Sequence, residues 1–497
     1  MKNLVAACAL LGALLVTAPA AAVDFGANDD TGKFAEDGGA VFFPQMAAAG
    51  LKQNVMTIRW LPGTTDIPDV EDLDRAVPIA VASGVKVAFA VYPYPPSAIE
   101  AGLAKPEDFA AWLDALARRY PDVTTYIVGN EPNINTFWRA QGNGSGLILS
   151  GATFGRFLAA GYDALKAVST DITVLGVGSS PRGDRAPAWA GKSSPVHFIG
   201  ALGDWYRRSG RQLPLMDGFS FHPYPNPSNF TVPFTWTYGW PNAGIHELAR
   251  IKQALWDAFD GTAQPTTVKG LKLYLDEVGW QVDTSALGLY TGSENVRVTT
   301  EAAQADIYNQ LVRHVVCDPD VAQVNFFGYY DERDRGGWQS ALRRLDGTER
   351  PAHARVTDAI AATGGACQSQ MRWWQPRREP LGVKISFSSI KGVRAKAPRL
   401  FDFAASVKED VTMKAGLVPA GTPAARIPAL LGNVGSLIAY RKSPKSIVAV
   451  PRTGRFVLAV QIAAKMNPAR VSLFRSPAFT VAPALGRPRD PIRFGVR

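Results

Sequence analysis

Short apolar runs alternate with helix-like stretches along the first three quarters of the chain. A strand with one solvent-exposed face has a polar residue at every second position. These runs lack that alternation, so we expect strands that are covered on both sides. The stretches between them place apolar residues three and four positions apart, as in 106–120, which begins with proline and is stopped by Pro121. Strands are expected near 23–26, 55–60, 85–92, 125–128, 172–177, 218–222, 271–277 and 324–330.

Helices are expected between and after these strands. They lie near 39–51, 70–82, 106–120, 152–168, 196–208, 245–259, 301–316 and 353–362. Eight strands that alternate with eight helices predict an α/β fold, a (β/α)8 TIM barrel, over residues 23–366.

The pattern changes after about residue 365. Residues 367–382 are basic and contain proline, and we interpret them as a linker. Short runs between turn residues then predict a smaller, basic, β-rich C-terminal domain over residues 383–497. Because Pro and Arg crowd 487–493, a partly disordered basic tail is the alternative. The strands of the C-terminal all-β domain are expected near 383–390, 447–450, 455–462 and 470–474.

The first 22 residues have the pattern of a secretory signal peptide. A short basic start precedes the apolar run 4–16, and 18–22 offers small residues for cleavage. An uncleaved membrane anchor is the alternative, but the run is shorter than the ~20 residues that a span needs. No later segment resembles a transmembrane helix, so we expect a secreted, extracellular protein.

Removal of this leader leaves two cysteines, Cys317 and Cys367. Export permits a disulfide, and the sequence leaves open whether these two side chains meet. They are too few and too far apart for a structural zinc site, and the chain has no His-Glu-x-x-His run and no dinucleotide fingerprint. We therefore expect neither a metal nor a cofactor.

The net charge of +10 is unevenly distributed. From Met371 to the end, 23 Lys and Arg stand against 5 Asp and Glu, whereas the rest of the chain carries 30 against 38. Such different balances favour two domains. We expect the basic part to attract an anionic cell-wall polymer, acidic polysaccharide or membrane surface, and we expect no nucleic acid partner because the Lys and Arg are scattered and the protein is exported. We expect a monomer.

Two acidic motifs follow strands that are far apart in sequence. Glu131 lies in Asn-Glu-Pro-Asn after the fourth expected strand, and Glu277 lies in Asp-Glu-Val-Gly-Trp at the end of the seventh. The carboxyl ends of barrel strands gather catalytic residues at one face. Cleavage of a glycosidic bond requires two such carboxyls, one to protonate the leaving oxygen and one to attack the sugar or stabilise its cation. A carbohydrate is therefore the expected substrate.

Other polar and aromatic residues are expected at the same face. Arg59 ends the second strand, Asn130 adjoins Glu131, and His222 and Tyr224 follow the sixth strand. An Arg and a Tyr hydroxyl near one glutamate favour its ionised form. Trp280 and Trp338 belong to a set of loop aromatics that suit stacking against sugar faces.

These residues together resemble those of the clan A glycoside hydrolases, the retaining (β/α)8-barrel glycosidase superfamily, which includes cellulase-like enzymes. In that superfamily an Asn-Glu pair after the fourth strand supplies the acid/base, and a glutamate after the seventh supplies the nucleophile. The resemblance covers about residues 23–365. It implies that Glu131 is the acid/base and Glu277 the nucleophile, and it favours a β linkage in the substrate.

The resemblance also implies roles for neighbouring residues. Asn130 matches the residue that binds the sugar 2-hydroxyl, Arg59 the basic residue near the nucleophile, and Tyr224 the tyrosine that hydrogen-bonds it. The chain departs from the pattern at its eighth strand, which lacks the tryptophan that many members place there, and we predict Trp338 as the sugar platform. An inactive barrel that binds carbohydrate or attaches to the cell wall is the rival interpretation.

Overall fold

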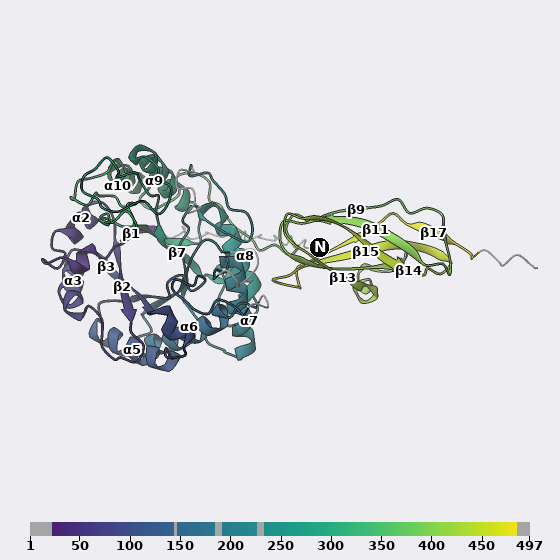
Figure 1. Ribbon diagram of the computed structural model, residues 1–497, viewed down its shortest axis with the longest axis horizontal. Coiled ribbons are helices and arrows are strands. Elements are labelled where there is room, and N and C mark those ends of the chain that lie inside the picture. The colour runs from purple at the N-terminus through teal and green to yellow at the C-terminus, as the bar shows by residue number, and fades with distance from the viewer. Residues whose placement is uncertain (1–21, 144–146, 184–190, 226–232, 485–497) are drawn as a thin grey trace, which may run out of the picture.

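The computed structural model describes residues 22–143, 147–183, 191–225 and 233–484. Within these residues a closed barrel of eight parallel strands is followed by a separate body of antiparallel sheets (Figure 1). The predicted TIM barrel with a smaller C-terminal β domain is thereby confirmed. Nearly all of the predicted leader lies outside the described residues, and no described helix has the length and hydropathy to cross a membrane.

Each of the eight expected strands is present in the barrel. They are β1 (Asp24–Asn28), β2 (Gln53–Trp60), β3 (Lys86–Pro93), β4 (Thr125–Val128), β5 (Thr173–Ser179), β6 (Gly218–Phe221), β7 (Lys272–Val278) and β8 (Val321–Phe327). Each pairs in parallel with the next, and β8 pairs with β1 to close the ring.

Helices cover the outside of the ring, as Figure 1 shows. They are α1 (Thr31–Phe34), α2 (Phe42–Ala48), α3 (Val70–Ala82), α4 (Pro96–Glu100), α5 (Pro106–Arg119), α6 (Ser150–Val168), α7 (Pro195–Ser209), α8 (Leu248–Phe259), α9 (Glu301–Val315) and α10 (Pro351–Thr363). Short 3-10 helices, η1 (Ile245–Glu247) and η2 (Thr267–Lys269), precede α8 and β7.

Apolar layers on both sides of the strands explain their continuous hydrophobic character. Inside the ring, Val55, Ala88, Ile127 and Leu175 from four neighbouring strands form one buried cluster. Outside it, alternate residues of the same strands join the helices in a much larger cluster. Side chains on both faces are therefore withdrawn from water, which provides the main stabilisation of the barrel.

The C-terminal domain is built from two sheets. Their strands are β9 (Lys384–Phe387), β10 (Val393–Arg394), β11 (Arg399–Ser406), β12 (Val411–Pro419), β13 (Gly432–Leu437), β14 (Lys442–Ala449), β15 (Gly454–Ala464), β16 (Val471–Arg475) and β17 (Phe479–Ala482). One sheet has the order β14-β11-β9; the other has the order β10-β17-β15-β12-β13, with β16 also paired to β15. Two 3-10 turns, η3 (Ala424–Arg426) and η4 (Pro428–Leu430), connect β12 to β13.

The segment that we interpreted as a linker follows the barrel surface. Cys317, after α9, and Cys367 form a disulfide at the start of this segment. Arg372 then donates to the carbonyl oxygen of His314 on α9, and the backbone of Arg377 donates to Gln253 on α8. The segment is therefore fixed to two barrel helices before the β domain begins.

The β domain packs against the α7 and α8 side of the barrel (Figure 1). Arg470, between β15 and β16, donates to Asp257 of α8 at 2.8 Å and to Glu409 at 2.7 Å. The side chains of all three residues are no more than 6 % exposed. The backbone N–H of Trp240 also donates to the hydroxyl of Tyr440 across the interface. A buried ion-pair cluster thus joins the two domains.

Candidate active site

The backbone turns sharply at the end of β4. Gly129 has a φ of 114° and Glu131 a φ of 42°, a left-handed conformation that L-residues adopt only at an energetic cost. The N–H of Glu131 donates to the carbonyl oxygen of Gly178, near the end of β5, at 2.7 Å, which holds the turn in place. Glu131 consequently lines the cleft at the carboxyl ends of the strands.

Both predicted glutamates contact the same histidine nitrogen. Nδ1 of His222 lies 3.2 Å from Oε1 of Glu131 and 3.3 Å from Oε2 of Glu277. The sum of these two distances is the upper limit on the separation between the two carboxyl oxygens. The structure thus brings together β4, β6 and β7 at one point, as the strand-end positions predicted.

Further donors hold Glu277. The hydroxyl of Tyr224 donates to Oε2 at 3.1 Å, and Nδ2 of Asn28, at the end of β1, donates to Oε1 at 3.3 Å. Tyr224 was predicted from the sequence to lie here, and Asn28 was not. A signal for it was present, because Asn28 ends the first strand and is followed by two further polar residues, Asp29 and Asp30. Both oxygens of Glu277 are thus oriented by hydrogen bonds.

The electrostatics of the pair depend on His222. Burial raises the pKa of Glu277 to about 8, with Glu131 and Asp276 adding to the rise and His222 opposing it. Burial lowers the pKa of His222, but the charges of Glu277 and Asp276 outweigh burial and raise it well above its ordinary value. Both ring nitrogens of His222 face carboxyl oxygens, since Nε2 lies 3.2 Å from Asp276, and this arrangement favours the protonated ring.

The cleft above this cluster has a volume of about 640 Å³. Glu131, Glu277 and Tyr224 line its floor, and the loops after the strands line its walls. The lining also includes Asn28, Asp29, Asp30, Arg59, Tyr92, Asn130, Ile134, Arg182, Lys192, Glu332 and Trp338. His222 lies beneath them and is 1 % exposed. It is placed to orient the glutamates, not to contact a ligand.

Two predicted residues line the cleft without contacting Glu277. Arg59 donates to the hydroxyl of Tyr92 at 3.0 Å and lies over the ring of Tyr94; among the described residues it forms no ion pair with Glu277. Asn130 adjoins Glu131 at the cleft wall. Arg59 therefore lies at the cleft wall against Tyr92 and Tyr94, and within the described residues it makes no direct ion pair with Glu277.

The two predicted tryptophans have different positions. Trp338 lines the cleft, and its ring stacks on Tyr224 with centroids 5.2 Å apart and planes 23° apart. Trp280 is 1 % exposed, packs near Tyr308 and Phe234, and does not line the cleft. Its prediction as a substrate contact is corrected, because the residues after Glu277 turn inward and place this indole in the core.

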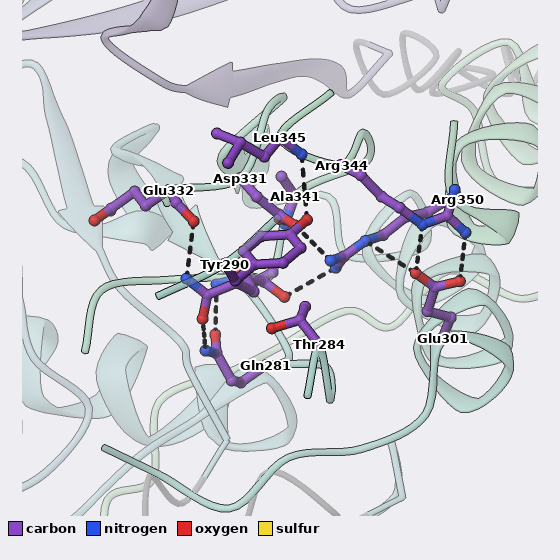
Figure 2. Close-up of polar contacts among 12 residues, drawn as sticks. Gln281, Thr284, Tyr290, Glu301, Asp331, Glu332, Ala341, Arg344, Leu345 and Arg350 are labelled. Atoms are coloured by element: carbon purple, nitrogen blue, oxygen red, sulfur yellow. Dashed lines mark hydrogen bonds and ion pairs between the residues drawn. The ribbon is translucent and has the colours of Figure 1, made fainter. Parts of the chain in front are cut away.

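Buried polar contacts connect the two loops that carry this side of the cleft (Figure 2). Asp331, after β8, accepts from Tyr290 of the β7–α9 loop at 2.6 Å and pairs with the guanidinium of Arg350. Arg350 and Arg344 both reach Glu301 at the start of α9. Glu332 and Trp338 lie in the same loop after β8, so this network holds in place the loop that carries them to the cleft.

No group of three or more His, Cys, Asp or Glu side chains suited to hold a metal ion occurs in the described ranges.

No protein-family model matches the chain, and no curated protein matches it. The chain is similar to several solved structures of glycosidases at low sequence identity.

One such structure is that of GH5_18 from Bifidobacterium longum, 14 % identical, with 73 % of this chain and 83 % of that chain covered and a TM-score of 0.48. Another is a GH5-4 broad specificity endoglucanase from Clostridium longisporum, 10 % identical, covering 67 % and 88 % with a TM-score of 0.45. A modular endo-beta-1,4-mannanase from Cellulomonas fimi is 12 % identical, covering 93 % and 94 % with a TM-score of 0.40.

Proposed function

We propose that the protein is a secreted, retaining glycoside hydrolase of the clan A type that cleaves O-glycosidic, β-configured bonds of an oligosaccharide or polysaccharide. One observation carries the proposal: Glu131 and Glu277 share the Nδ1 of His222 at 3.2 and 3.3 Å. Retaining pairs lie about 5–5.5 Å apart, whereas inverting pairs are separated by ~6.5–9.5 Å to admit a water. Because both carboxyls lie so close to one nitrogen, they are near each other, which supports the short separation of a retaining pair.

In the first step Glu277 attacks the anomeric carbon while Glu131 gives its proton to the glycosidic oxygen. The carbon–oxygen bond breaks, the leaving alcohol departs, and an ester forms between the sugar and Glu277. In the second step Glu131, now a carboxylate, takes a proton from water, and the water oxygen attacks the same carbon. Glu277 leaves as a carboxylate, and Glu131 is protonated again.

The surrounding residues suit these roles. Tyr224 and Asn28 donate to Glu277 and so favour its anionic form against the effect of burial. The imidazolium of His222 adds a positive charge beneath both carboxyls. The ring of Trp338, stacked on Tyr224, offers an apolar surface for the C–H face of a sugar beside the nucleophile.

Secretion and the C-terminal domain belong to the same proposal. The Cys317–Cys367 disulfide is compatible with an oxidising compartment outside the cytoplasm. The basic composition from Met371 onward supports attraction of the β domain to an anionic polymer of the cell wall, in addition to catalysis by the barrel.

The test is hydrolysis of a panel of aryl glycosides, with the anomer of the first-formed product read by proton NMR. We expect the product to keep the configuration of the substrate. Glu277→Gln should lose at least about a thousandfold in kcat. Glu332→Gln is the matched control, because it makes the same change on another cleft glutamate, and it should retain activity on small substrates. Inverted product would refute the mechanism. Binding without cleavage of any panel member would favour the inactive-barrel alternative.

A further inference from the structure

Two basic side chains line the cleft on the side of Glu131. Arg182 follows β5, and Lys192 lies shortly before α7. Both are half-buried. Lys192 forms an isolated β-bridge with Ile134, three residues after Glu131, so its segment runs directly alongside the acid/base motif.

Asn133 of that motif holds both basic segments. Its Nδ2 donates to the carbonyl oxygens of Ser180 and Ser193, at 3.2 and 2.8 Å, and its Oδ1 accepts from the N–H of Ser180 at 2.8 Å. The side chain is fully buried. The residues that flank Arg182 and Lys192 are therefore tied to one amide.

The two segments also pack backbone to backbone. A Cβ built at Gly183 would lie 2.1 Å from the carbonyl carbon of Ser193, so only glycine fits this approach. Gly183 also donates to Asn242 at 2.9 Å. The backbone beside Arg182 and Lys192 is consequently held at the cleft wall by hydrogen bonds and close packing.

Arg182 and Lys192 lie close to the acid/base motif and form no salt bridge within the described residues. Lys33, near the cleft, pairs with Asp30 and Asp69. The cleft acids Asp29 and Asp30 lie after β1, four strands away from β5 in the ring of eight. Arg182 and Lys192 therefore gather beside Glu131, whereas across the cleft Asp30 is paired with Lys33 and Arg59 lies near the end of the neighbouring strand β2.

We infer that the leaving-group side of the cleft binds an anionic sugar residue, one that carries a carboxylate or a sulfate ester, through Arg182 and Lys192. The inference rests on the proposed function, because the acid/base protonates the leaving oxygen and so marks the side on which the leaving group lies. A neutral leaving group would leave two half-buried cations without a charged partner among the residues that the structure describes.

The chemistry of the two side chains fits such a ligand. An Arg guanidinium offers two parallel N–H donors that match the two oxygens of a carboxylate, and a Lys ammonium adds a point charge. Hydrogen bonds between charged groups are stronger than neutral ones, and loss of one typically reduces affinity about tenfold or more.

The test measures binding to the Glu277→Gln variant by titration calorimetry, so that affinity is read without turnover. The probes are oligosaccharides that contain uronic acids, each with its carboxyl-reduced counterpart, and sulfated oligosaccharides, each with its desulfated counterpart. We expect at least one anionic probe to bind about tenfold more tightly than its neutral counterpart. Raising the salt concentration should narrow the difference.

Variants made in the same background assign the preference. R182Q/K192Q should reduce the ratio of the two affinities to about one, and R182K/K192R, which keeps both charges, should preserve most of it. R208Q/K105Q removes two exposed charges outside the cleft lining and should leave the ratio unchanged. Circular dichroism checks that each variant is folded.

The outcomes separate the two proposals. Equal binding of every anionic probe and its neutral counterpart, or a preference that survives in R182Q/K192Q, would overturn the anionic subsite even if aryl glycosides are cleaved. A preference that depends on Arg182 and Lys192 in a protein that cleaves no glycoside would preserve the anion site and refute the hydrolase. The probe pair that shows the preference identifies carboxylate or sulfate.

Discussion

The hydroxyl of Tyr224 donates a 3.1 Å hydrogen bond to Oε2 of Glu277. The same ring stacks on Trp338, so one residue links the nucleophile to the aromatic wall of the cleft. Tyr224→Phe removes the hydrogen bond and keeps the stack. We expect kcat/KM to fall about 10- to 100-fold, the range for a bond to a charged group, with little change in melting temperature. A Tyr224→Phe variant with unchanged kcat would contradict a catalytic contribution of the Tyr224 hydroxyl. Trp338→Ala should instead act mainly on KM.

Removal of the acid/base should depend on the leaving group. Glu131→Ala should spare the first step for aryl glycosides whose leaving groups need no proton, and it should strongly slow cleavage of unactivated substrates. Added azide should restore the second step and yield a glycosyl azide of retained configuration. Steady-state and burst kinetics on both substrate types provide the measurement. Equal losses on both, without an azide effect, would show that Glu131 is not the acid/base.

The pH profile of kcat/KM should have an acid limb well above the ordinary range of a glutamate. Glu277 attacks as an anion, so activity is gained as pH rises through its pKa, which burial raises to about 8. Because the charge of His222 lowers that pKa, His222→Asn should move the limb to still higher pH. Rates from pH 5 to 10 test both statements. Glu332→Gln is the control, and a wild-type limb near 4.5 would be the contrary result.

The buried Asp331–Arg350 pair should contribute to both stability and substrate binding. Arg350→Met leaves Asp331 buried without its cation, and we expect a loss of about 3–5 kcal/mol in the free energy of unfolding. KM should rise because the loop that carries Trp338 loses its support. Arg344→Met is a matched control, because Arg344 binds the same Glu301 near the surface and should cost under ~1 kcal/mol. Denaturant unfolding of both variants measures the loss of stability. Equal losses in the two variants would show that burial of the ion pair is not the cause.

The domain interface should respond to the loss of one cation. Arg470→Met leaves Asp257 and Glu409 facing each other in a buried setting, and about 3–5 kcal/mol of unfolding free energy should be lost. Lys465→Met, an exposed neighbour, is the control and should change little. Arg470→Met with wild-type stability would mean that the interface contributes nothing to folding.

Strand-end placement was sufficient to predict the centre of the site. Glu131, His222 and Tyr224 follow apolar strands, Glu277 lies near the end of another, and the strands of a parallel barrel end at one face. Trp280 could not be assigned in the same way, because its sequence neighbours do not reveal whether a loop turns toward the cleft or the core. Asn28 was missed because an amide at a strand end has many uses, and only the fold brings it to Glu277.

The strands of the C-terminal domain were harder to predict from the sequence than those of the barrel. Its strands β11 and β12 alternate buried residues such as Phe401 and Met413 with exposed ones such as Asp402 and Lys414, so no continuous apolar run marks them. Their long-range pairing with β14 and β15 supplies what local sequence does not. The strand predicted at 455–462 was found because both of its faces are largely covered.

The buried cluster of Arg470, Asp257 and Glu409 also affects how the molecule moves in solution. Since the segment before the β domain is bound to α8 and α9, and the domain itself is joined to α8 through this cluster, neither connection leaves a free hinge. The two domains should rotate together, as one elongated particle with a single slow correlation time. Fluorescence anisotropy decay from labels on either domain would then report the same rotation.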